Sequence, residues 1–166
     1  MAFGEIIKYL NERRMYMEEK MIGSNVVTQI GIVVHDAEKT AKMYEKVFGI
    51  KPTSTVITDT VDVAKTEYKG SSTKARAKLI FFKMGSLDIE LIEPDSEPST
   101  WREFLDKHGE GVHHIAFQIK GMKDTVAALE ANGMPLVQKG EYTGGRYAYI
   151  DAEDKLKVIV ELLEND

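Results

Sequence analysis

Two acidic residues lie inside short apolar segments that have the composition of buried strands. Glu90 stands in Ile89-Glu90-Leu91-Ile92, and Glu161 stands in Val160-Glu161-Leu162-Leu163. Carboxylates are almost never buried without a partner, because removing a charge from water is costly. Each acid alone would most simply form an ion pair with Lys or Arg, and a metal ion is the other way to compensate the charge.

An internal repeat relates these two acids and adds two further polar residues. An offset of 71 residues places Glu90 on Glu161, and an offset of 85 residues places Gln29 on His114. The segments around each pair match, whereas the loops between them differ in length. This pattern indicates a duplicated structural unit, which superimposes two pairs of potential ligands.

The repeat therefore brings together four side chains that can bind metal: Gln29, Glu90, His114 and Glu161. One amide oxygen, one imidazole and two carboxylates suit a six-coordinate divalent ion that keeps positions open for water or substrate. Gly31 and Ala116 follow two residues later on the same strand faces and leave room for a ligand. We predict that the four side chains converge on one divalent metal; taken singly, Gln29 could be an ordinary polar residue and His114 a hydrogen-bonded one. His113 is expected on the opposite strand face, bonded to backbone.

A second candidate for ligand contact follows the turn Gly144-Gly145. Tyr147 and Tyr149 alternate onto one strand face beside Arg146. One interpretation is a lid in which Arg146 holds an anionic group of a substrate and Tyr147 contacts the substrate. The alternative is aromatic packing along a strand edge.

Composition restricts the class of protein. The 166 residues contain no Cys and carry a net charge of −5 with acidic and basic residues intermixed. The absence of Cys excludes disulfides, Fe–S clusters and Cys-type zinc sites, and the lack of a basic face argues against nucleic-acid binding. No apolar run reaches the roughly 20 residues that span a bilayer, and the charged N-terminus does not resemble a secretory signal. We expect a cytoplasmic protein without membrane or nucleic-acid partners.

The elements that must position these residues form two similar modules. Residues 1–22 predict a helical extension, whose apolar stripe suggests a homodimer contact. Residues 26–94 predict a β-α-β-β-β module with a helix between Asp36 and Gly49 and strands at 54–58, 61–68, 77–84 and 86–92. Residues 95–111 predict a linker with a short helix that Thr100 caps and Glu103 completes. Residues 112–164 repeat the module, with a helix at 122–131 and strands at 136–139, 146–151 and 157–163. The expected fold class is α+β.

The chain resembles the vicinal oxygen chelate superfamily, which includes glyoxalase I and methylmalonyl-CoA epimerase. The resemblance covers residues 26–164 and depends on Gln29-Ile30-Gly31-Ile32-Val33-Val34, Asp88-Ile89-Glu90-Leu91-Ile92-Glu93-Pro94, Gly109-Glu110-Gly111-Val112-His113-His114 and Val160-Glu161-Leu162. The Gly-Glu-Gly-Val-His-His segment is most similar to the epimerase branch. Epimerases usually have His at the position of Gln29, and they carry a His-Pro-Lys-Ser-like stretch where this chain has residues 151–155. A Gln-Glu-His-Glu set is similar to that of some glyoxalase I enzymes.

The resemblance implies two modules in a cupped mixed sheet around a metal held by Gln29, Glu90, His114 and Glu161, with Ni, Co, Zn or Mn as the expected ion. It further implies a metal-dependent isomerase or lyase that moves a proton beside a carbonyl of a small-molecule substrate. Glu161 is the expected general base and Glu90 the second candidate. An epimerase-like reaction is favoured, and a glyoxalase I-type lyase and a metal-free sequestering protein are the alternatives. An extradiol dioxygenase is disfavoured, because such enzymes bind iron through two His and one carboxylate.

Overall fold

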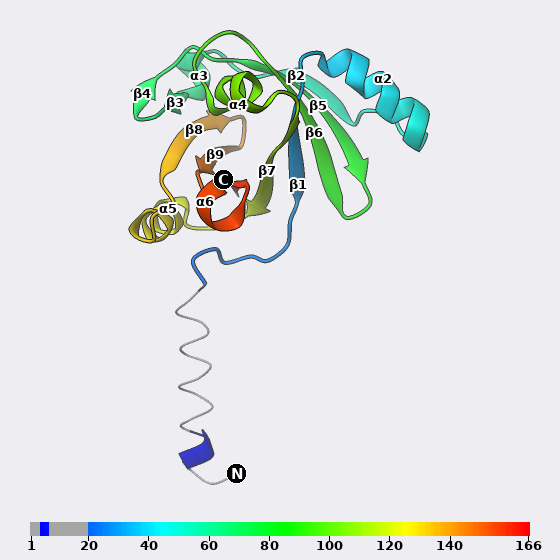
Figure 1. The fold of residues 1–166 in the computed structure, drawn as a ribbon. Coiled ribbons are helices and arrows are strands. Elements are labelled where there is room, and N and C mark those ends of the chain that lie inside the picture. Colours follow the sequence, from blue (N-terminus) through cyan, green and yellow to red (C-terminus); the bar gives the residue numbers. More distant parts are fainter. Residues whose placement is uncertain (1–3, 7–19) are drawn as a thin grey trace.

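A mixed β-sheet that curls into a cup dominates the computed structural model, which describes residues 4–6 and 20–166 (Figure 1). In this part of the chain the sheet has ten strands in the order β2-β5-β6-β1-β7-β10-β9-β8-β3-β4. Of the expected helical extension over residues 1–22, residues 4–6 are helical and residues 20–22 are not, and residues 1–3 and 7–19 lie outside the described residues. No helix in the described chain is long and apolar enough to cross a membrane.

The first module contributes six strands and two helices to the described structure. They are β1 (Gln29–Val33), α2 (Ala37–Phe48), β2 (Ser54–Ile57), α3 (Val61–Ala64), β3 (Glu67–Tyr68), β4 (Ser71–Ser72), β5 (Ala77–Met84) and β6 (Leu87–Pro94). The predicted limits of α2 are confirmed, because the Asp36 side chain accepts a hydrogen bond from the Lys39 amide and Gly49 ends the helix at a φ of 67°.

The second module repeats the arrangement after a connecting helix. Its elements are α4 (Thr100–His108), β7 (Gly111–Gln118), α5 (Met122–Ala131), β8 (Leu136–Tyr142), β9 (Gly145–Ile150), α6 (Glu153–Leu156) and β10 (Ile159–Asn165). The four-residue helix α6 was not predicted. It fills the connection between β9 and β10 that differs from the corresponding connection in the first module.

The strand register confirms the internal repeat. In the first module β1 pairs with β6 in parallel and sets Gly31 beside Glu90; in the second, β7 pairs with β10 in parallel and sets Ala116 beside Glu161. The modules join where β1 and β7 pair in antiparallel fashion, with Gln29 opposite Ala116. The four predicted ligands therefore sit on the four central strands of the sheet.

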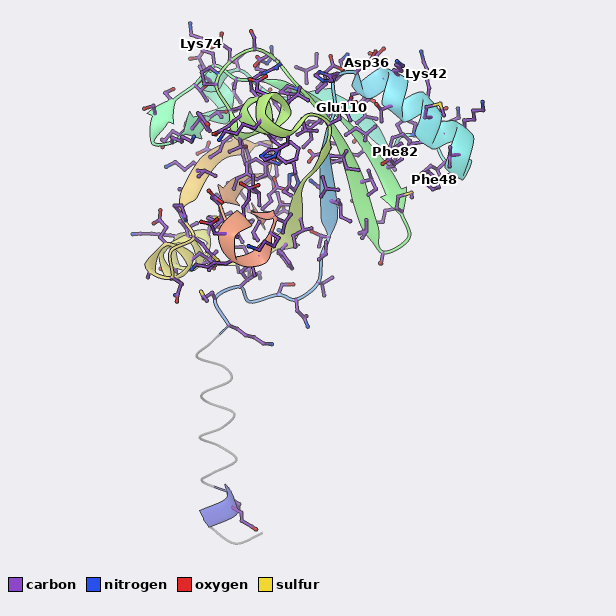
Figure 2. All side chains as sticks on the ribbon, viewed as in Figure 1. Asp36, Lys42, Phe48, Lys74, Phe82 and Glu110 are labelled. Carbon is purple, nitrogen blue, oxygen red and sulfur yellow. The ribbon has the colours of Figure 1, made fainter. Side chains whose placement is uncertain are left out.

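Helices α2 and α5 cover the outer face of the cup, and helix α4 lies against its inner face. The small residues Ala37 and Ala41 let α2 lie close to the first module, where Phe82 of β5 is fully buried beneath it (Figure 2). Helix α5 covers the second module with Leu129. Helix α4 packs Trp101 against the inner face and so forms one wall of the cup.

Two predictions about these elements need correction. Residues 61–68 form a helical turn followed by a two-residue strand, because Ala64 becomes buried when its amide bonds to the Thr60 carbonyl and Lys65 then turns the chain at a φ of 47°. The cap of α4 is Ser99, whose Oγ accepts from the Arg102 amide at 3.0 Å, so Thr100 is the first helical residue. Thr100 instead donates its amide hydrogen to Gln138 Oε1 at 2.8 Å.

The hairpin of β3 and β4 crosses the predicted boundary between modules. It belongs to the first module in sequence, yet Glu67 of β3 pairs with Lys139 of β8. The first module thus completes one edge of the second. The chain segment that leads to this hairpin contributes Thr58, Asp59, Ala64 and Thr66 to the lining of a cavity on the inner face of the sheet.

Candidate metal centre

Three of the four predicted ligands meet on the inner face of the sheet. Single donor atoms of Glu90, His114 and Glu161 all lie within 4.8 Å of one another. Nε2 of His114 lies 3.1 Å from Oε2 of Glu161 and 3.4 Å from Oε2 of Glu90. All three side chains are buried, and they come from three different strands, so the sheet itself fixes their spacing.

Gln29 joins the same group from β1. Its Nε2 lies 2.7 Å from Oε2 of Glu90, 3.3 Å from Oε2 of Glu161 and 3.3 Å from Nε2 of His114. The amide N–H group, a partly positive donor, thus faces the three groups at once. To bind a metal, the amide would have to present Oε1, which requires it to turn over, and the oxygen and nitrogen of an amide are distinguished only by their hydrogen bonds.

The electrostatics of the cluster favour a divalent cation. Among the described residues, no Lys or Arg forms an ion pair with Glu90 or Glu161. These buried acids therefore lack the ion pairs that were the simplest alternative to a metal ion. Burial, and then the charge of Glu161, raises the pKa of Glu90 well above its ordinary value. Two buried carboxylates, an imidazole and an amide fit a divalent ion, because its charge would balance both acids.

His113 lies on the same side of β7 as His114, in contrast to the prediction. Gly31 of β1 pairs with His114 while Ile32 pairs with Val112, so His113 is the extra residue of a β-bulge. The bulge sets the two imidazoles edge to face with their Nδ1 atoms 3.0 Å apart. Burial, reinforced by His114, lowers the pKa of His113 well below its ordinary value, so the ring is neutral.

A cavity of about 590 Å³ lies beside the cluster, a volume that can hold a small organic molecule. Gln29, Glu90 and Glu161 lie at its floor, and Trp101, Tyr147 and Tyr149 are among its walls. The indole Nε1 of Trp101 donates to the hydroxyl of Tyr149 at 3.1 Å, which fixes both rings. Burial raises the pKa of Tyr147 to about 12, so its hydroxyl is protonated at neutral pH.

Arg146 does not belong to this cavity. Alternation along β9 turns Tyr147 and Tyr149 toward the cup, and Arg146 faces the other side, where its guanidinium pairs with Glu164 at 2.9 Å and with Asp166. Of the two predicted substrate contacts, the structure therefore places Tyr147 at the cavity and Arg146 away from it. Sequence reasoning missed Trp101, although a single Trp in a short amphipathic helix was a usable signal.

Comparison with known proteins assigns the family. A profile described as the glyoxalase/bleomycin resistance protein/dioxygenase superfamily matches residues 28–149. The chain belongs to this superfamily. A relative in Bacillus subtilis (strain 168), the uncharacterized protein YqjC, is 30% identical over 143 residues, covering 84% of this chain and 92% of the relative.

Solved structures share the fold of this chain. A hypothetical protein from Bacillus halodurans C-125 superposes with a TM-score of 0.63 at 24% identity, covering 86% of this chain and 96% of the other. Methylmalonyl-CoA epimerase from Mycobacterium tuberculosis superposes with a TM-score of 0.60 at 23% identity, covering 89% and 91%. The cupped sheet of paired modules predicted from the resemblance is thus confirmed.

Proposed function

We propose that this member of the superfamily is a metal-dependent isomerase or lyase that moves a proton at a carbon adjacent to a carbonyl. The observation that supports it best is the convergence of Gln29, Glu90, His114 and Glu161 at the floor of a cavity. These four residues would hold one divalent ion, with Ni, Co, Zn or Mn as candidates. When bound, the ion would polarise the substrate carbonyl and stabilise negative charge on its oxygen.

Glu161 is the proposed general base. It lies at the floor of the cavity, and as a ligand that can leave the metal its carboxylate would become a base beside the reacting carbon. It takes a proton from the substrate carbon, and the carbon–hydrogen electron pair moves into the neighbouring carbonyl. The proton then returns to the same carbon or to its neighbour.

Glu90 occupies the corresponding position in the other module and supports the epimerase-like version of this reaction. One carboxylate can remove the proton from one face of the carbon, and the other can deliver a proton to the opposite face. Trp101 and Tyr149 keep bulk water away from the exchanged proton, since both are almost fully buried. The aromatic walls therefore keep water from the reacting carbon during the transfer itself, and each carboxylate exchanges its proton with solvent between turnovers, so deuterium from D₂O would enter the product.

The relatives suggest two substrates for testing this chemistry. Methylmalonyl-CoA epimerases are among the structural neighbours, and one was solved with methylmalonyl-CoA and NH4+. The second substrate type is a thiol–aldehyde adduct, which the resemblance of the Gln29-containing ligand set to glyoxalase I supports. Both reactions begin with removal of a proton beside a carbonyl or an incipient carbonyl.

Deuterium exchange measures the shared step directly. Metal-loaded protein is incubated in D₂O with methylmalonyl-CoA, with the N-acetylcysteamine thioester of methylmalonate, and with methylglyoxal adducts of glutathione and of 2-mercaptoethanol. We expect enzyme-dependent exchange or product in at least one case. Glu161→Gln should lower the rate roughly 10²–10⁴-fold, the usual contribution of a general base, while the exposed control Glu97→Gln leaves it unchanged. Absence of exchange with all four would contradict the proposal, and tight ligand binding without turnover would favour a sequestering protein.

A further inference from the structure

The charges around the cavity restrict which molecules can enter it. Four carboxylates line the cavity: Asp59, Glu90, Glu141 and Glu161. Within the described chain, no Lys, Arg or His is among its lining residues. A divalent ion would balance the two acids at the floor, and the two acids near the mouth would remain.

The negative charges of Asp59 and Glu141, the two acids near the mouth of the cavity, are only partly balanced by neighbouring cations. Glu141 and Asp59 are both exposed. Lys65 lies 3.8 Å from Glu141, but its side chain is 66% exposed and it lines the outer groove of the sheet and not the cavity. Solvent screens such an exposed pair, so Lys65 offers little attraction to a group inside the cup.

Backbone donors near the cavity are also occupied. Helix α4 contributes Trp101 to the wall, and its N-terminus is a place where an anion could bind. The Thr100 amide donates to Gln138 Oε1 at 2.8 Å, and the Arg102 amide donates to Ser99 Oγ at 3.0 Å. An anionic group deep in the cup would therefore lose its hydration without gaining a cation or these amides.

The remaining walls are suited to apolar and aromatic groups. Phe81, Trp101, Tyr147 and Tyr149 present rings, and Leu79 and Leu163 add aliphatic surface. Val56 and Ile57 extend this surface to the mouth, where they are 44% and 59% exposed. Such walls gain free energy from burying a planar or aliphatic body.

We infer that, beyond the oxygens that reach the metal, the substrate has an apolar or aromatic body that carries no negative charge. This inference rests on the proposed function, because the metal site defines which end of the substrate is polar. The inference disfavours coenzyme A and glutathione conjugates as substrates, because their negatively charged distal phosphates or carboxylates would face Asp59 and Glu141. A neutral body fits the cavity, and a cationic one gains from these two acids.

Three hydroxamates that differ only in their distal group test the inference. Benzohydroxamate, 4-carboxybenzohydroxamate and 4-(aminomethyl)benzohydroxamate present the same metal-binding oxygens to Ni²⁺-loaded protein. Trp101 is the single Trp of the chain and lines the cavity, so its fluorescence reports binding at this site. We expect the neutral and cationic probes to bind about tenfold or more tightly than the carboxylated one.

Charge-neutralising variants sharpen the test. Asp59→Asn with Glu141→Gln should reduce the discrimination against the carboxylated probe, and Glu97→Gln should not change it. Equal or tighter binding of the carboxylated probe by the parent protein would overturn the inference and leave the proposed function intact. If none of the probes binds the metal-loaded protein, the metal site itself is wrong and the inference falls with it.

A second observation, independent of the cavity, concerns His113. Two nitrogens 3.0 Å apart, Nδ1 of His113 and Nδ1 of His114, can share only one proton between them. If Nε2 of His114 binds the metal, the proton of His114 is on Nδ1 and His113 must accept it. The proton of His113 is then on its buried Nε2, which interacts with the backbone of Thr100 but lacks the geometry of a regular hydrogen bond.

We infer that His113 is a positioning residue that sets the tautomer and orientation of His114. The bulge of β7 supplies this contact by placing both rings on one side of the strand. Outer partners of metal-binding histidines typically change metal affinity about 10–100-fold. His113 is such an outer partner, because it contacts Nδ1 of His114 and not Nε2, the atom that would bind the metal.

Two variants separate positioning from packing. His113→Asn keeps an acceptor near Nδ1 of His114, whereas His113→Phe keeps a ring against Phe104 but offers none. We expect His113→Phe to weaken Co²⁺ binding about 10–100-fold and to alter the visible spectrum of bound Co²⁺, and His113→Asn to restore most of the affinity. His113→Leu replaces the Phe variant if that protein does not fold. Equal losses in all variants, or no loss in any, would overturn the inference.

Discussion

Gly31 lies opposite His114 in the paired strands β1 and β7, and a Cβ atom on Gly31 would lie 2.0 Å from Cε1 of the imidazole. The absence of a side chain on Gly31 thus makes space for the proposed metal ligand. The sequence suggested that Gly31 leaves room for a bound molecule, and in the structure the room is filled by His114.

Gly31→Ala should therefore displace the His114 ring and disrupt the cluster. We expect loss of high-affinity metal binding and a decrease of about 1–3 kcal/mol in the free energy of unfolding, the usual cost of an overpacked core. Calorimetric titration with Ni²⁺ and urea unfolding measure both. Gly111→Ala is the matched control on β7, because its nearest contacts, atoms of the Phe104 ring, are at 4.0 Å. Unchanged metal affinity in Gly31→Ala would contradict the assignment of His114.

The raised pKa of Glu90 predicts how the metal-free protein responds to pH. Burial, and then the charge of Glu161, makes the folded protein hold this proton more tightly than the unfolded chain, whose carboxyl has a pKa near 4.5. Stability from this group is therefore full below that value and is lost as pH rises toward the folded pKa. Glu90→Gln removes the effect, so metal-free Glu90→Gln should become progressively more stable than metal-free parent above about pH 4.5.

Urea unfolding of both chelator-treated proteins from acidic to neutral pH gives this difference. Saturating Ni²⁺ should reverse its sign, because the parent then gains the binding free energy that the variant lacks. A difference that stays constant with pH would show that Glu90 is not the group responsible.

The cap of α4 yields a prediction about stability alone. Ser99 is 1% exposed and its Oγ accepts from the Arg102 amide. Ser99→Ala should lower the free energy of unfolding by about 1 kcal/mol, the typical loss for an N-cap. Ser96→Ala, at an exposed position in the same linker, should change it by less than about 0.5 kcal/mol. Equal effects of the two substitutions would be inconsistent with Ser99 as the cap.

The predictable part of the structure is the part that the repeat encodes. The offset that matches Gln29 with His114 and the offset that matches Glu90 with Glu161 are sufficient to place all four residues on central strands, because strands with the same pattern occupy equivalent places in a duplicated sheet. The caps of α2 followed from local side-chain chemistry. The caps depend on residues that are neighbours in the sequence, and the repeat recurs at fixed offsets. Both signals can therefore be read from a single sequence.

Other features depend on contacts that a sequence pattern does not encode. The side of β7 on which His113 lies is reversed by one extra residue, since a bulge changes the alternation of side chains. Arg146 was grouped with Tyr147 through a turn expected to move, whereas regular pairing with β10 holds Arg146 on the outer face near Glu164. The pairing of β3 with β8 joins the two modules and is visible only in three dimensions.

The central claim is that Gln29, Glu90, His114 and Glu161 hold one divalent ion, and metal stoichiometry tests it most directly. The chelator-treated parent protein is reloaded with Ni²⁺, Co²⁺, Zn²⁺ or Mn²⁺, passed through a desalting column and analysed for metal per chain. We predict one ion per chain for the parent and none for the double variant Glu90→Ala with Glu161→Ala, with both proteins folded by circular dichroism. A parent that retains no metal, or a double variant that retains as much as the parent, would contradict the account.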